Sequence, residues 1–282
     1  KRSPNERDQM RSLLLEAIET EARCQNLPVC FSHIKDEEHP LANMLEDRGY
    51  DHALIPPTYY LDIDWTSFDD YLSDPKRISK NRRRTIMNEI NRNRKENVRI
   101  ELLTDVAKYE HRLYELINSN YMKHNGLPIY FTPNYLRELK KNLGPDCLVY
   151  ISRKNRILTG CCILLKKMGV GHLYLTGVDR EVSRRDKTYF NLCYYQPTRD
   201  AIADGLRKLT FGIGLHEIKT RRGCQMRNQF IYYKPRRKRT RLVTKPALRM
   251  ISKWYARKGP QQKILRVPNP GKDTKSPSRD QN

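Results

Sequence analysis

The sequence is short of acidic residues and of long apolar runs. Its 282 residues include 32 Asp and Glu against 55 Lys and Arg, which gives a net charge of +23. The longest apolar stretches, such as residues 157–165, are far too short to cross a bilayer, and nothing resembles a signal peptide. The seven cysteines are odd in number and irregularly spaced, which argues against a disulfide framework. We therefore expect a cytoplasmic protein without a membrane span.

Several catalytic signatures are also missing. The sequence contains no Gly-x-Ser-x-Gly nucleophile elbow and no phosphate-binding P-loop. Cys161 and Cys162 are adjacent rather than spaced as metal ligands, and no cluster of His and Cys accompanies them. We expect neither a metal site nor a tightly bound cofactor.

Hydrophobic residues make up 38% of the chain, which is enough for one large or two small globular domains. Their spacing predicts helices at 6–23, 41–46, 78–94, 105–122, 133–143, 188–205 and 245–258. Strands are predicted at 27–34, 58–65, 98–102, 148–152, 157–165, 172–178, 208–212 and 229–233. Short turns join the three strands between 148 and 178, so we expect an antiparallel meander. Pro197 should kink its helix or delay its start.

The positive charge is concentrated in two regions. Residues 221–282 contain 19 Lys or Arg against 2 acidic residues, and residues 76–99 contain 10 against 2. Clusters of this kind are typical of surfaces that bind a polyanion, because neutralising phosphates requires grouped cations. An alternative is a solvated basic helix followed by a basic tail. The candidate polyanion-binding residues are Arg82, Arg83, Arg84, Arg236, Arg237, Lys238 and Arg239.

An ordered set of motifs resembles one family. In chain order they read YLTGVD at 174–179, YF at 189–190, CYYQ at 193–196, AIADGL at 201–206, FGIG at 211–214 and EIKTRRG at 217–223. Upstream, Trp65, Phe68 and Tyr71 lead into the basic helix that contains residues 82–84. Over residues 59–233 the chain resembles the GNAT-fold N-acyltransferases of the FemAB-like, peptidoglycan-biosynthesis-like kind.

The resemblance implies an α/β GNAT fold, with a mixed, largely antiparallel central sheet flanked by helices. It implies one complete GNAT-like domain plus part of a second. We assign residues 1–66 to the C-terminal part of a first unit, 67–258 to the acyltransferase domain and 259–282 to a basic, disordered tail.

Fem-type enzymes transfer an amino acid from aminoacyl-tRNA to an amine of a peptidoglycan precursor, and the resemblance implies the same donor here. A lysine near the end of their second domain helps to polarise the ester carbonyl, and the matching residue is Lys219. His216 and Glu217 are the nearest candidates to accept the ammonium proton. Asp179 follows a strand that should face the cleft, although a turn cap is an equal alternative. Lys219 has the alternative of an exposed strand lysine.

A second feature of the sequence, the loop at 180–187, concerns the identity of the acyl donor. Acyl-CoA-dependent GNAT enzymes bind pyrophosphate with a glycine-containing turn after their fourth strand, and the corresponding loop at 180–187 has no glycine. This favours a phosphate-rich donor other than CoA, held by charge. The candidate donor-binding residues are Arg184, Arg185, Lys187, Tyr189, Tyr194, Arg221 and Arg222. The candidate acceptor-binding residues are Tyr121, Tyr130 and Tyr174, whose alternative is a role in the core.

Three functions remain open from the sequence. The first is an N-acyltransferase that moves an amino acid from aminoacyl-tRNA to a small molecule or peptide. The second is an acyl-CoA-dependent GNAT N-acyltransferase whose basic tail has another purpose. The third is a GNAT-like module without catalysis that binds RNA or protein.

Overall fold

The computed structural model describes residues 3–258, so the tail predicted at 259–282 lies outside the described residues. Two compact units divide this part of the chain. Unit 1 contains residues 3–60, Ile213–Thr220 and 224–258, and unit 2 contains Leu61–Gly212 and Arg221–Gly223. The first segment of unit 1 ends at Tyr60, near the boundary predicted at residue 66. The C-terminal strand and helix, which the sequence assigned to the acyltransferase domain, pack with the N-terminal residues.

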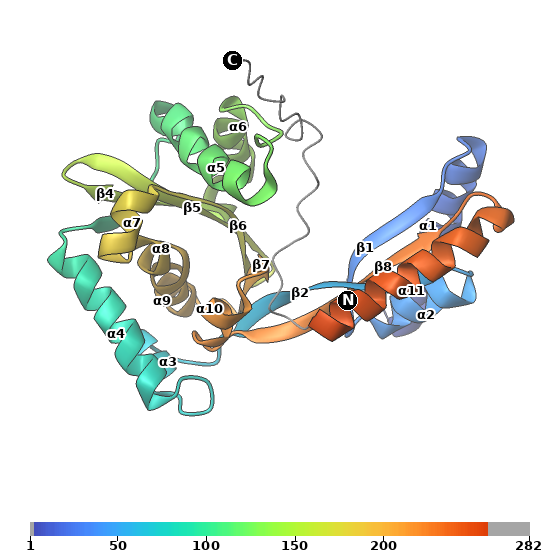
Figure 1. The fold of residues 1–282 in the computed structure, drawn as a ribbon, viewed down its shortest axis with the longest axis horizontal. Coiled ribbons are helices and arrows are strands. Elements are labelled where there is room, and N and C mark those ends of the chain that lie inside the picture. The colour runs from blue at the N-terminus through green and yellow to red at the C-terminus, as the bar shows by residue number, and fades with distance from the viewer. Residues whose placement is uncertain (1–2, 259–282) are drawn as a thin grey trace, which may run out of the picture. The chain divides into compact units, whose positions relative to one another are not determined.

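Unit 1 combines strands from both ends of its sequence. Strand β8 (Gln225–Lys234) pairs antiparallel with β1 (Val29–Lys35) on one side and with β2 (Asp51–Asp62) on the other. The helices are α1 (Pro4–Cys24), α2 (His39–Asp47), the short α10 (His216–Thr220) and α11 (Arg241–Lys258), and Figure 1 shows the strands and helices of this unit. Its core contains Leu15, Ile34, Leu45, Tyr50 and Tyr232.

Local sequence explains the ends of the elements in unit 1. Ser3 accepts a hydrogen bond from the Glu6 amide, and the Glu6 carboxylate accepts one from the Ser3 amide, so α1 begins with a capping box. Strand β2 starts seven residues before the predicted strand, because the pairing continues across Pro56 and Pro57. The register shifts between Ile55 and Thr58, and this irregularity accommodates the prolines, which have no N–H to donate.

The sheet of unit 2 has the order β7-β6-β5-β4-β3. These strands are β3 (Arg99–Leu102), β4 (Cys147–Lys154), β5 (Ile157–Lys167), β6 (Val170–Val178) and β7 (Lys208–Ile213). All pair antiparallel except β6 and β7, which are parallel. The structure therefore confirms the predicted meander and the α/β class, with a mixed, largely antiparallel sheet flanked by helices.

Helices cover both faces of this sheet (Figure 1). On one face lie α5 (Glu110–Asn125) and α6 (Asn134–Leu143). On the other lie α8 (Thr188–Phe190), a π-helical segment (Asn191–Tyr195) and α9 (Gln196–Ala203), with α4 (Lys80–Lys95) packed against them. A Cβ built on Gly177 of β6 would lie 2.4 Å from the backbone of Leu116, so glycine allows α5 to approach the strand this closely.

One prediction about local structure was wrong, and the irregularity expected near Pro197 was confirmed. Residues 180–187, expected to be a loop, contain helix α7 (Arg180–Asp186), and only Lys187 is left-handed, at φ 60°. The helix predicted at 188–205 is interrupted by the π-helical segment, and α9 begins with Pro197 in its first turn. Proline has no N–H for a bond to the preceding turn, so the irregular segment lies just before it. Helix α3 (Phe68–Ser73) completes unit 2.

Candidate functional site

The segment at 211–223 reverses direction several times. Gly212, Gly214 and Leu215 have φ values of 64°, 74° and 54°, all in the left-handed region. This conformation is sterically strained at Leu215, because only glycine adopts it freely. The residues that follow form α10, so the expected crossing between strands contains a helical turn.

Lys219 is 2% exposed and lies on α10, which overturns its alternative as an exposed strand lysine. Its Nζ donates a hydrogen bond to the Ile213 carbonyl oxygen at 2.8 Å and lies 5.0 Å from the centre of the Tyr59 ring. Burial lowers the pKa of Lys219 to about 7, since the charged ammonium loses water. The lysine can therefore change protonation state near neutral pH.

Tyr59 also contacts His216. The Tyr59 hydroxyl oxygen lies 3.0 Å from His216 Nδ1, and the ring centres are 5.7 Å apart. His216 and Lys219 are three residues apart on a helix, so both reach the same tyrosine. Glu217 is exposed. Tyr59 is fully buried, and burial raises its pKa to about 12. Unit 1 thus brings the two predicted residues Lys219 and His216 together around Tyr59, which the sequence did not identify.

Arg222 belongs to a buried cluster in unit 2. Its Nη2 lies 2.6 Å from Glu89 Oε2, its Nε donates to the Tyr195 hydroxyl at 3.0 Å, and its guanidinium lies 4.0 Å from the centre of the Phe190 ring. The Tyr195 hydroxyl also donates to Glu89, and Tyr71 donates to the Arg222 carbonyl oxygen.

Burial acts to lower the pKa of Arg222, but Tyr195 and Glu89 outweigh it, and the pKa is raised. The Arg222 side chain, 6% exposed, therefore holds the interior of unit 2 together. Arg221, its neighbour in the sequence, is exposed.

Asp179 is the N-cap of α7. Its Oδ1 accepts hydrogen bonds from the amides of Glu181 at 3.1 Å and Val182 at 3.4 Å. This supports the cap that the sequence left as an alternative to a role in the cleft. Arg184 and Arg185 are exposed in the last turn of α7, and Lys187 follows the helix. The carboxylate therefore occupies the amides that a free helix start would offer to a phosphate.

The predicted tyrosines differ in exposure. Tyr194 is 2% exposed and stacks on Phe211 with ring centres 5.0 Å apart, and Tyr189 packs edge-on against it. Tyr174 is 37% exposed, and its hydroxyl lies 2.8 Å from that of Tyr135. Tyr130 is 79% exposed, and the partly buried Tyr121 packs against the core of unit 2. Tyr130 and Tyr174 are thus the most exposed of the acceptor-binding candidates.

The basic candidates are divided between the units. Arg82, Arg83 and Arg84 are exposed on the first turns of α4 in unit 2. Arg236, Arg237 and Arg239 are exposed between β8 and α11 in unit 1, and Lys238 lies among them in the chain. The prediction that these residues bind a polyanion stays a prediction.

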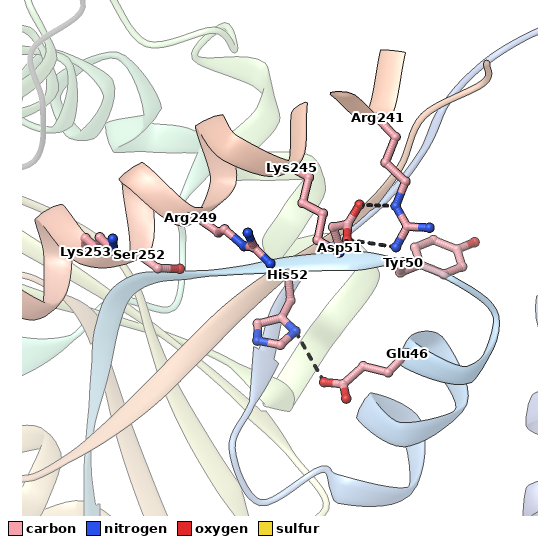
Figure 2. A pocket seen from close by; sticks show the side chains of 9 residues that line it. All are labelled: Glu46, Tyr50, Asp51, His52, Arg241, Lys245, Arg249, Ser252 and Lys253. Carbon is pink, nitrogen blue, oxygen red and sulfur yellow. Dashed lines mark hydrogen bonds and ion pairs between the residues drawn. The ribbon is translucent and has the colours of Figure 1, made fainter. Parts of the chain in front are cut away.

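Next to the second group, unit 1 has a hollow of about 720 Å³ (Figure 2). Asp51 accepts two hydrogen bonds from Arg241 there, at 2.7 and 2.9 Å, and these lower its pKa. Lys245, Arg249 and Lys253, each one turn apart on α11, also line it, so α11 supplies cations that the sequence reading did not single out.

Within residues 3–258, no group of three or more His, Cys, Asp or Glu is placed to hold a metal ion. In the same part of the chain, no helix combines the length and apolar character needed to span a bilayer. All seven cysteines are free thiols.

Comparison with known proteins gives one family and several similar folds. The FemAB-like family model, described as peptidoglycan biosynthesis/recognition, matches residues 1–245. No curated protein matches the chain in sequence. The crystal structure of FemX has a TM-score of 0.62 at 10% identity, over 84% of this chain and 79% of that one. L-PGS from Bacillus licheniformis has a TM-score of 0.60 at 14% identity, over 86% and 78%.

A third structure is the C-terminal domain of a putative lysylphosphatidylglycerol synthetase from Agrobacterium fabrum. It has a TM-score of 0.59 at 12% identity, over 86% of this chain and 78% of that one. At such identities the likeness concerns the fold.

Proposed function

Since the chain belongs to the FemAB-like family, we propose that it is a transferase that forms an amide bond by moving an amino acid from aminoacyl-tRNA to an amine of a small molecule or peptide. The observation that carries the proposal is the buried Lys219, at the position that the family resemblance selects. The structural likeness to FemX, to L-PGS and to the C-terminal domain of a putative lysylphosphatidylglycerol synthetase is consistent with a transferase.

The reaction needs a neutral amine, stabilisation of an oxyanion and a route for one proton. The amine nitrogen attacks the ester carbonyl carbon, and a tetrahedral intermediate forms. The bond between that carbon and the ribose oxygen of tRNA then breaks. The proton lost by the amine ends on the ribose oxygen, so the products are an amide and free tRNA.

In this proposal the protonated Lys219 stabilises the oxyanion. A buried cation acts strongly on a nearby developing charge, because little water screens it. The Ile213 carbonyl holds Nζ in place, and the Tyr59 ring face stabilises the cation. His216, whose Nδ1 is next to the Tyr59 hydroxyl, relays the proton from the amine.

The start of α7 supports a donor other than CoA. The Asp179 carboxylate already occupies the amides of Glu181 and Val182, and its negative charge repels a pyrophosphate there. The side chains of Arg184 and Arg185 are exposed at the other end of α7. In this proposal they hold donor phosphates by charge.

The test offers the full chain either tRNA charged with labelled amino acids or labelled acetyl-CoA, together with a lysine-containing peptide as acceptor. We expect label to pass from tRNA into an alkali-stable amide. Lys219→Met should reduce turnover by about a hundredfold or more, the usual cost of losing an oxyanion-stabilising group. The matched Lys141→Met, an exposed lysine of unit 2, should react as the wild type.

Transfer from acetyl-CoA alone would refute the donor. If neither donor reacts while tRNA still binds, and Lys219→Met binds it equally well, the chain is a binding module rather than an enzyme.

A further inference from the structure

Unit 2 contains a second hollow, of about 740 Å³, and none of the residues assigned to the reaction is among those that line it. It is lined by the end of α4, by β3, by the turn between β4 and β5 and by the start of α9. The lining includes a single carboxylate, Glu101, and five arginines: Arg94, Arg99, Arg153, Arg156 and Arg199.

Two of the arginines are held in fixed orientations. Arg153 Nε lies 2.8 Å from Glu101 Oε1, and its guanidinium lies 4.7 Å from the centre of the Tyr109 ring. Arg199 donates to the Gln196 side chain at 3.1 Å and lies 4.5 Å from the centre of the Phe68 ring. A guanidinium that is already oriented loses little conformational entropy when it binds an anion.

The other three arginines are exposed. Among residues 3–258, Arg94, Arg99 and Arg156 have no hydrogen bond, ion pair or ring contact from their side chains. Arg99 is directly opposite Arg153 in the antiparallel pair of β3 and β4. Like charges in such a pair destabilise a sheet, so stability does not explain this arrangement. Glu101 offsets the charge of Arg153, and an anion bound beside Arg99 would offset the second charge.

The end of α4 accounts for only part of the cluster. Cations in the last turn stabilise a helix through its dipole, which explains Arg94. Arg99, Arg153, Arg156 and Arg199 come from other elements, so the helix dipole does not explain them.

The charge extends beyond the hollow. Helix α4 has 16 residues, a length of about 24 Å, and carries the exposed residues 82–84 at its other end. A single phosphate would occupy only the hollow. A ligand with a row of phosphates could contact both the hollow and the basic residues along α4. Side-chain amides of Asn97 and Asn155 in the lining can donate to sugar and phosphate oxygens.

We propose that this arginine hollow and the exposed face of α4 form a binding site for the phosphodiester backbone of RNA. The assignment of that RNA as the donor tRNA rests on the function proposed above. The site binds tRNA by charge, without reading its bases, and holds the body of the molecule while the aminoacyl end reacts elsewhere.

The experiment measures binding of deacylated tRNA to the full chain by fluorescence anisotropy between 50 and 200 mM KCl. The double variant Arg99→Ala/Arg156→Ala should bind about tenfold more weakly at low salt, and the slope of log K against log salt should fall by about 1 to 2. The control Lys123→Ala/Lys141→Ala removes equal charge from exposed lysines of α5 and α6, on the opposite face of the sheet. It should change affinity less than about twofold. Arg99→Lys/Arg156→Lys should retain most of the binding.

Equal losses in the hollow variant and in the control would overturn the proposal, because net charge alone would then explain binding. Strong binding of inorganic pyrophosphate that tRNA fails to displace would also overturn it. Failure here is separable from failure of the proposed function. If the wild type transfers amino acids from tRNA while the hollow variant keeps its KM for tRNA, only this site is wrong. If the hollow binds tRNA but only acetyl-CoA reacts, only the proposed donor is wrong.

Discussion

Lys219 makes the stability of the protein depend on pH. Its pKa is about 7 in the folded chain and near 10.4 when unfolded, so the unfolded chain binds more protons between these values. The free energy of unfolding should therefore rise with pH from 7 to 10 by up to about 1.4 kcal/mol per unit from this group. Lys219→Met removes the cost of burying the charge. The free energy of unfolding of this variant, relative to the wild type, should therefore be greatest below pH 7 and decline towards pH 10.

Urea unfolding at several pH values measures this difference. The exposed lysine variant Lys141→Met serves as the control and should show no such trend. A constant difference between Lys219→Met and wild type from pH 6 to 10 would contradict the lowered pKa.

Glu89 should be a strong determinant of the stability of unit 2. It pairs with Arg222 at 2.6 Å, and the two side chains are 13% and 6% exposed. Glu89→Gln leaves the guanidinium without this charge and should cost about 3 kcal/mol, as for other broken buried pairs. The matched Glu115→Gln breaks an exposed pair with Arg112 and should cost less than about 1 kcal/mol. Thermal unfolding of both variants measures these losses in stability. Equal losses would show that the cluster is not important for stability.

The sequence located Lys219 and His216 but not their surroundings. The family resemblance selects Lys219, and His216 was a candidate because it is one of the nearest proton acceptors in the sequence. Tyr59, which contacts both, is more than 150 positions earlier in the sequence, and no local pattern connects it to them. Glu89 did leave a signal, because it is one of two acidic residues in the basic region 76–99. A largely buried carboxylate in such a basic segment needs a cationic partner, and Arg222 provides it.

At the level of elements, the contact between α5 and β6 depends on Gly177. An added Cβ would lie 2.4 Å from the Leu116 backbone, which cannot move as a side-chain tip can. Gly177→Ala should therefore lower the free energy of unfolding by about 1 to 3 kcal/mol, a typical cost of overpacking. Gly205→Ala in the same unit meets no atom within 4 Å and has only the cost of its φ of 66°, about 1 kcal/mol. Urea unfolding compares them, and a neutral Gly177→Ala would show that α5 can shift.

Apolar periodicity predicted the long elements and missed the short helices α7 and α10. The three meander strands were predicted because each has a run of apolar residues, and they differ from β4, β5 and β6 by a few residues at their ends. Helix α7 has Val182 as its only aliphatic residue and is fixed instead by the Asp179 cap. Helix α10 has five residues, less than two turns, so no periodic pattern can develop in it.

At the scale of the whole molecule, unit 1 combines segments that are far apart in the sequence, so its composition could not be predicted from consecutive residues. Strand β8 pairs with β1 and β2, which lie some 170 to 200 positions earlier in the sequence. Periodicity identifies a strand but not its partner, so a division into consecutive domains was the natural expectation. Helix α11 belongs to unit 1 as well, through the Ser252 hydroxyl that accepts from the Leu54 amide.

The net charge of +23 predicts how catalysis responds to salt. A tRNA donor would release bound counterions when it meets this chain, so its affinity should fall steeply with ionic strength. With about three phosphate contacts, the KM for aminoacyl-tRNA should rise more than about tenfold between 50 and 200 mM KCl. The KM for a small amine acceptor, which releases few counterions, should change little, and so should kcat. Steady-state kinetics at four salt concentrations measures all three constants. A KM for the donor that is insensitive to salt would mean that the basic regions take no part in donor binding.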